Sequence, residues 1–189
     1  MKQDTDITRG RAELLEALQD YLRRFPSERA VVDRMIDFLL REAGCFERAT
    51  LEGHFTGSAW IVHPTSEQVL LTHHRKLNKW LQLGGHADGV ENLLTVALSE
   101  AHEESGIDGF EVIQASIYDV DIHVIPARKS DPEHLHYDVR YLFRAQSDQY
   151  IISNESHDLA WVAVSDIALL TSEESMLRMA NKWNVISRR

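Results

Sequence analysis

The sequence contains a single cysteine, Cys45, among its 189 residues, and that scarcity narrows the class of protein. One thiol cannot form an internal disulfide, so we expect a protein of a reducing compartment, the cytoplasm. The N-terminal segment MKQDTDITRG is polar and has none of the apolar core that a signal peptide needs. Apolar runs such as AWIV are short, whereas a membrane span needs about 20 apolar residues. We therefore expect no membrane partner.

Basic residues are also in the minority. Lys and Arg number 20 against 30 Asp and Glu, which gives a formal net charge of −10. Nucleic acids and anionic membranes are bound by basic surfaces, so this balance argues against a nucleic-acid partner. A carboxylate-rich site neutralised by metal ions would agree with the negative net charge. Hydrophobic residues make up 43% of the chain, which is enough for a packed core and excludes a disordered chain.

Apolar periodicity predicts a helical hairpin over residues 7–43. Pro26 interrupts the pattern, Ser27 is expected to cap the second helix, and Gly44 to end it. Beyond Phe46 the pattern becomes that of strands. The expected strands are 54–64, 67–74, 111–128, 134–146 and 160–164, and a last helix is expected over about 172–183. This order predicts the α+β class.

One predicted helix concentrates acidic side chains. Asn92 is suited to cap it and Gly106 to end it. The residues expected to face the core are Leu94, Ala97, Leu98 and Ala101. Glu100, Glu103 and Glu104 follow the same i, i+3, i+4 spacing, so they share another face. Their mutual repulsion is relieved by hard divalent cations, although a solvated acidic face is the ordinary alternative.

The segment 85–107 decides between these alternatives, because it resembles the Nudix box, G-x5-E-x7-R-E-U-x-E-E-x-G-U with U aliphatic. Its positions are held, in order, by Gly85, Glu91, Glu100, Glu103, Glu104, Gly106 and Ile107. The resemblance extends over about residues 50–170 and implies a Nudix-like α/β/α sandwich with a mixed β-sheet. Residues 46–189 would form this domain, and residues 1–45 would be an N-terminal helical hairpin added to it.

The resemblance also implies an activity. Nudix enzymes use Mg²⁺ or Mn²⁺ to hydrolyse the pyrophosphate bond of a nucleoside diphosphate linked to another moiety, so the expected partner is such a small molecule. The metal ligands that it implies are the Gly85 carbonyl, Glu100, Glu103 and Glu104. Glu91 would support the junction between loop and helix. The general base is either Glu100 or Glu155, and the sequence leaves this choice open.

One position departs from the pattern, since Ser99 stands where the box has arginine. In the family that arginine orients the box carboxylates through charge-assisted hydrogen bonds, which serine cannot supply. Either Lys76, Arg75 or Arg140 compensates from elsewhere, or the geometry of the carboxylates is looser. The departure raises an alternative function, a catalytically weak module of this fold that binds or senses a nucleotide. An isoprenoid diphosphate isomerase ranks last, because Cys45 is poorly placed to be its catalytic cysteine.

Histidine, with ten residues, is the remaining unusual feature. By resemblance, the strand end with His74 and Arg75 faces the substrate phosphates; otherwise it is an ordinary polar strand end. His134 and His136 share a strand face, but a zinc site would also need ligands such as His123 or Asp138. We favour substrate contact or exposure for the pair. The N-terminal hairpin is a lid, a brace for the sheet or an element of a homodimer.

Overall fold

The computed structural model describes residues 7–75, 78–127, 132–152 and 156–188. Among these residues the strands are β1 (Gly53–Val62), β2 (Gln68–His74), β3 (Lys79–Leu81), β4 (Leu83–His86), β5 (Phe110–Ile125), β6 (His134–Ala145) and β7 (Ser156–Ala163). The helices are α1 (Arg9–Arg24), α2 (Arg29–Arg41), α3 (Leu93–Ser105), α4 (Ile167–Leu170) and α5 (Glu174–Ile186), and 3-10 turns span Pro26–Glu28 and Val164–Asp166.

All these strands join one mixed sheet, in which five of them follow the order β3-β2-β1-β6-β5 and β4 and β7 pair beside this path. Strand β1 lies at its centre and pairs in parallel with β6 along its whole length. Its other edge is shared, because β4 pairs with residues 56–59 and β2 pairs only with Ile61 and Val62. Strand β7 pairs with β2. This sharing brings β4, which carries the glycine pair, to the middle of the molecule.

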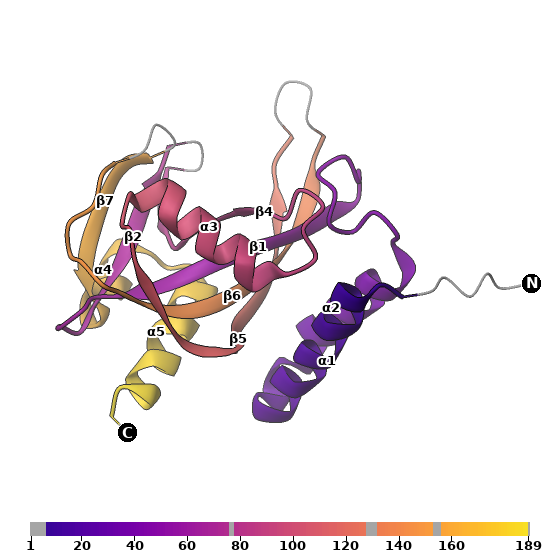
Figure 1. Cartoon of the computed structure of the whole chain (residues 1–189), viewed down its shortest axis with the longest axis horizontal. Coiled ribbons are helices and arrows are strands. Elements are labelled where there is room, and N and C mark those ends of the chain that lie inside the picture. The colour runs from indigo at the N-terminus through magenta and orange to yellow at the C-terminus, as the bar shows by residue number, and fades with distance from the viewer. Residues whose placement is uncertain (1–6, 76–77, 128–131, 153–155, 189) are drawn as a thin grey trace, which may run out of the picture.

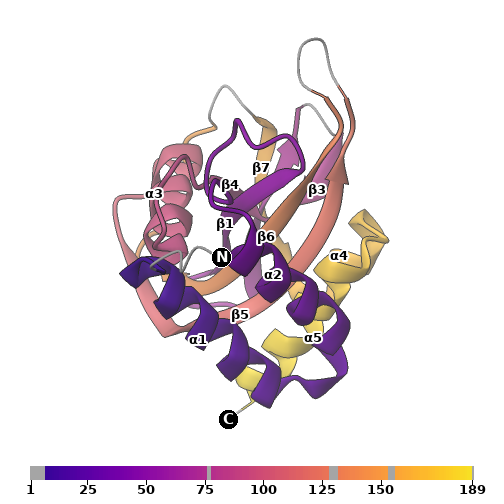
Figure 2. The ribbon, with the colours of Figure 1, turned by 90° about the vertical axis from the view of Figure 1, so that its right-hand side faces the viewer.

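Helices cover both faces of the sheet. Helix α3 lies across one face and α5 lies behind the other, as the two views show (Figure 1, Figure 2). Side chains alternate along a strand, so one core lies on the α3 side and includes Phe55 and Val139. The second core lies on the α5 side and includes Trp60, Leu142 and Met179. The predicted α+β class with a mixed sheet is therefore confirmed.

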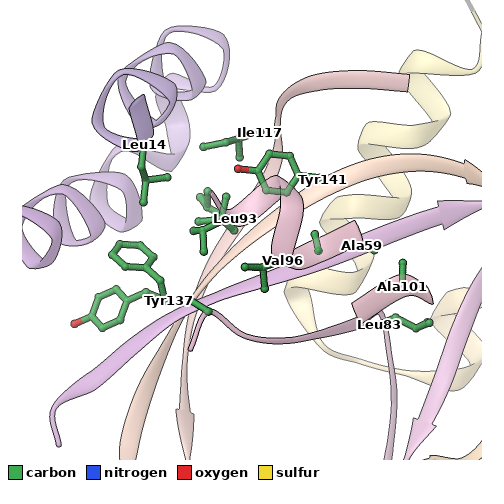
Figure 3. Close-up of a cluster of buried hydrophobic side chains, with 14 of the residues drawn as sticks. Leu14, Ala59, Leu83, Leu93, Val96, Ala101, Ile117, Tyr137 and Tyr141 are labelled. Atoms are coloured by element: carbon green, nitrogen blue, oxygen red, sulfur yellow. The ribbon is translucent and has the colours of Figure 1, made fainter. Parts of the chain in front are cut away.

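The N-terminal hairpin packs on the same face as α3. Its apolar stripe contributes Leu14, Leu18, Met35 and Phe38 to the core on that side. The ring of Phe38 stacks on Tyr137 of β6, with ring centroids 4.0 Å apart. Figure 3 shows how Leu14 of α1 points into this core together with Leu93 and Val96 of α3 and Tyr141 of β6. These contacts make the hairpin a brace for the sheet.

The second helix of the hairpin starts later than predicted. Pro26 opens a 3-10 turn, and α2 begins only at Arg29. Glu28 occupies the cap position and forms no side-chain capping bond, so the expectation that Ser27 caps this helix was wrong. No helix in the described part of the chain has the length and apolar character to cross a membrane.

Candidate active site

Helix α3 has the ends that its sequence predicts. The Asn92 side chain accepts a hydrogen bond from the Thr95 backbone N–H at 3.1 Å, and Gly106 closes the helix with a left-handed φ of 66°. The buried stripe is turned slightly from the expected one. Leu94 and Leu98 are only half-buried. The residues that the helix buries are Leu93, Val96, Ala97, Ala101 and Ser105.

A glycine allows this helix to approach β1 closely. A Cβ at Gly57 would lie 2.7 Å from the Leu93 carbonyl oxygen and 3.0 Å from the Ala97 nitrogen, both backbone atoms of α3. No side chain can therefore separate helix and strand at this point. The close contact fixes the distance between α3 and the sheet, and with it the position of the helix's acidic face.

The glycine pair of β4 meets two of the three acidic side chains. A Cβ at Gly85 would overlap the carboxylate of Glu100, so this carboxylate lies directly over the Gly85 backbone. The Gly84 backbone N–H donates a hydrogen bond to Glu104 Oε1 at 3.1 Å. Glu100 and Glu104 are half-buried, whereas Glu103 is exposed on the same helix. The structure therefore places the carboxylates of Glu100 and Glu104 against one short strand.

Ser99 is exposed on α3. The structure describes two of the three residues that were suggested to compensate for the missing box arginine. Arg140 is buried on the opposite face of the sheet, where it binds Asp138, and it does not replace a box arginine. Lys76 lies outside the described residues. Arg75 is exposed at the end of β2. Of the described residues among these three, Arg75 is thus the remaining candidate to compensate for the missing box arginine.

Glu91 connects the loop before α3 to the N-terminal hairpin. Its two carboxylate oxygens each lie 2.6 Å from the hydroxyl of Thr8, which caps α1. A Cβ at Gly10 would overlap the Glu91 side chain, so α1 and this loop are in direct contact. The sequence could not identify this partner, because Thr8 and Glu91 are distant in the chain.

The end of β2 carries the residues expected to meet phosphates. His74 is half-buried and pairs with Ser156 at the start of β7. His73 stacks on Trp80 with ring centroids 5.2 Å apart, so Trp80 belongs to this strand end. Glu155, the second candidate base, lies outside the described residues.

The sheet face away from α3 holds a buried ionic network that sequence reasoning missed. Arg140 is 2% exposed, and its guanidinium contacts Asp138 at 2.7 Å and Asp119 at 3.0 Å. Asp119 also contacts Arg178 at 2.8 Å and Lys182 at 2.6 Å, both from α5. A same-face pair of Asp138 and Arg140 was visible in the sequence, but its burial was not. The network fastens α5 to the sheet.

The single cysteine is packed inside the core. Cys45 is fully buried, and burial raises the pKa of its thiol to about 11 even though Arg11 lies beside it. A thiol with such a pKa is protonated at neutral pH and is a weak nucleophile. The structure gives Cys45 a packing role in the core.

The comparisons with known proteins agree with this geometry. The family model described as the NUDIX domain matches residues 54–182. A NUDIX-family hydrolase from Clostridium perfringens has a TM-score of 0.53 and 24% identity, over 70% of this chain and 97% of that chain. No curated protein sequence is similar enough to this chain to count as a match.

Two further structures share the fold at lower identity. The Ap4A hydrolase of C. elegans has a TM-score of 0.52 and 15% identity, over 71% of this chain and 97% of that chain. The dihydroneopterin triphosphate pyrophosphohydrolase of E. coli has a TM-score of 0.51 and 16% identity, over 68% of this chain and 92% of that chain. Identities this low establish the fold and leave the substrate open.

Proposed function

This chain belongs to the Nudix family, and on that premise we propose that it hydrolyses the pyrophosphate bond of a nucleoside diphosphate linked to another moiety. The observation that carries the proposal is the seating of Glu100 over Gly85 and of Glu104 on the Gly84 N–H. Ap4A and dihydroneopterin triphosphate, for which two of the similar structures are named, are phosphoanhydrides of the same chemical class.

The donor set fits a hard divalent cation, Mg²⁺ or Mn²⁺, because it consists of oxygen atoms. We propose that Glu100, Glu103, Glu104 and the Gly85 carbonyl hold the ion. Residue 85 must lack a side chain, since a Cβ there would displace the Glu100 carboxylate. When bound, the cation neutralises phosphate oxygens and lowers the pKa of water.

The other steps belong to residues of this chain. The Gly84 N–H holds the Glu104 carboxylate in a fixed direction. Glu100 or Glu155 accepts the proton of the attacking water, and both remain candidates. We assign His74 and Arg75 to the substrate phosphates, because a positive side chain at this strand end would offset phosphate charge. Glu91 supports the loop before α3 through Thr8.

The alternative is a module of the same fold that binds a nucleotide with little turnover. The exposed Ser99 favours it, since the box has an arginine there that supports the carboxylates. The two functions differ in what the unmodified protein does. A hydrolase releases products from a nucleotide panel, whereas a sensing module binds a member of the panel and leaves it intact.

The test is a panel of nucleoside diphosphate derivatives with Mg²⁺ and with Mn²⁺, comparing the parent with Glu103→Gln. Loss of even a supporting contact at a metal site costs 10–100-fold, so we expect kcat to fall at least about tenfold. Glu103 is exposed, so the substitution leaves the fold intact. The control is Glu16→Gln, which removes an exposed carboxylate from α1. Equal activity of parent and Glu103→Gln would refute the assignment.

A further inference from the structure

Three histidines from three different strands meet on the sheet face opposite α3. His54 lies on β1, His86 on β4 and His136 on β6. His54 is the direct register partner of His136, and His86 pairs with Thr56, two residues along the same face from His54. One possible ligand atom from each histidine lies within 4.8 Å of the other two. Within the described part of the chain, no other group of His, Cys, Asp or Glu converges in this way.

The cluster is separate from the candidate active site. Successive residues of a strand point to opposite faces, and residue 85 faces Glu100 on the α3 side. Gly84 faces Ser58 on the other side, and His86 follows the same alternation. Asp138, the carboxylate suggested as a partner by the sequence, hydrogen-bonds with Thr56 at 2.8 Å. Among the described residues the cluster thus consists of His54, His86 and His136, and Asp138 is not part of it.

The burial of His54 is costly unless the ring has a ligand. This side chain is 1% exposed, and neither of its ring nitrogens has a hydrogen-bond partner among the described residues. The Nε2 atom of His136 is buried and also lacks one. Buried polar atoms are almost always satisfied, and an unsatisfied one costs roughly 1–3 kcal/mol. A metal ion would satisfy one nitrogen of each ring.

The surroundings favour the neutral imidazole, which is the form that binds metals. Burial, followed by neighbouring imidazoles, lowers the pKa of His136 to about 2. Burial and the nearby His86 and His134 lower the pKa of His54 to about 4. The ring of His134 lies 5.0 Å from that of His54, and its Nδ1 is 2.9 Å from the Pro132 carbonyl. His134 therefore lies beside the cluster as a neighbour.

We propose that His54, His86 and His136 form a binding site for a transition-metal ion such as Zn²⁺, distinct from the carboxylate site. Three neutral imidazoles suit zinc and its neighbours in the first transition series, whereas Mg²⁺ and Mn²⁺ prefer oxygen ligands. Tetrahedral zinc with bonds of about 2.0–2.1 Å brings its nitrogens to about 3.3 Å from one another. The possible ligand atoms of the cluster, which all lie within 4.8 Å of one another, are close enough to take up this geometry with small side-chain movements. Three protein ligands leave a fourth position for water or another ligand.

The first experiment uses the unmodified protein, stripped of metal with a chelator and then loaded with one equivalent of Zn²⁺. X-ray absorption at the zinc edge distinguishes imidazole from carboxylate ligands. We expect about three imidazoles per zinc. A first shell of oxygen atoms without imidazole would place the ion on the glutamates and overturn the proposal, and so would the absence of bound zinc. Neither result depends on hydrolytic activity.

The second experiment identifies the histidines. His54→Asn and His86→Asn are compared with His63→Asn, which removes an imidazole that is outside the cluster and meets the ring of Trp161 edge-on. Zinc affinity is measured by competition with a chromophoric chelator. We expect each cluster variant to bind at least about tenfold more weakly and the control to match the parent. The half-buried His86 serves as the test if the His54 variant fails to fold. Parent-like affinity in the folded cluster variants would refute the assignment.

Discussion

Thr8 donates its hydroxyl hydrogen to the carboxylate of Glu91 and so joins the cap of the first helix to the loop before α3. The same hydroxyl accepts a hydrogen bond from the Arg11 backbone N–H at 3.4 Å. One side chain thus caps α1 and anchors a residue of the Nudix box. Through this link the hairpin holds the loop that leads into α3.

We expect Thr8→Ala to lower the free energy of unfolding by about 1 kcal/mol, because both the cap and the Glu91 contact are lost. Thr8→Ser keeps the hydroxyl and is the matched control. Urea unfolding of the parent and both variants measures the difference. If the alanine and serine variants unfold at the same urea concentration, the hydroxyl does not provide this stability.

Two glycines of adjacent strands should respond differently to alanine. At Gly57 the new methyl would meet the α3 backbone at 2.7 Å, so the helix must move and we expect a loss of about 1–3 kcal/mol. At Gly85 it would displace only the flexible end of Glu100, so we expect a folded protein with strongly reduced kcat. Thermal unfolding and turnover, measured on both variants, separate the effects. A Gly85→Ala variant with parental turnover would contradict the seating of Glu100 described above.

Ser99→Arg restores the residue of the box, and we expect faster turnover. The new side chain lies four residues before Glu103 on an exposed face, where it can support the acidic cluster. Support of metal-binding groups is worth roughly 10–100-fold, so the expected gain in kcat is at least about tenfold. Ser99→Gln is a control of similar length without charge. No gain in a folded arginine variant would show that the serine is already compensated.

The buried ionic network predicts a loss of stability in acid. Burial alone would raise the pKa of Asp121, but the hydrogen bond with His123 and the charge of Arg140 lower it to about 2, from an ordinary value of 3.8. Between these values the unfolded chain binds the proton and the folded chain does not. The free energy of unfolding therefore falls as the pH drops from about 4 to 2, by up to about 2 kcal/mol from this residue.

Asp121→Asn removes this proton uptake and should flatten the dependence of stability on pH in the same interval. Urea unfolding at several pH values between 2 and 5 provides the measurement. Asp108→Asn, at an exposed position, is the control and should keep the slope of the parent. A parental slope in Asp121→Asn would show that other carboxyl groups cause the acid sensitivity.

Local signals predicted much of the fold. The ends of α3 followed from Asn92 and Gly106, because caps depend on residues a few positions apart. The predicted start of α2 was wrong, because Pro26 opens a 3-10 turn and the α-helix begins only after it. The short strand β4 was not separated from the loop around it, since four residues with two glycines carry almost no periodic signal.

Local sequence patterns could not predict which polar groups are buried. The sequence showed Asp138 and Arg140 on one strand face, but burial depends on α5, which returns to this face only near the end of the chain. The histidine cluster required the strand order β4-β1-β6, in which residues distant in sequence become neighbours. Only the H-x-H pair on β6 gave a partial sign of it.

Asp119 contacts helices from both ends of the chain, and the contacts differ in charge. From the N-terminal side it meets the Tyr21 hydroxyl at 3.5 Å, and from the C-terminal side it meets Arg178 and Lys182. A protein shortened at its beginning would lose a neutral partner of this acid and keep three cations. A protein shortened by α5 would leave Arg140 to neutralise Asp119, Asp121 and Asp138. Truncation at the beginning of the chain would therefore spare the cations around Asp119 but take away core residues such as Leu18 and Phe38, whereas truncation of α5 would remove two of those cations.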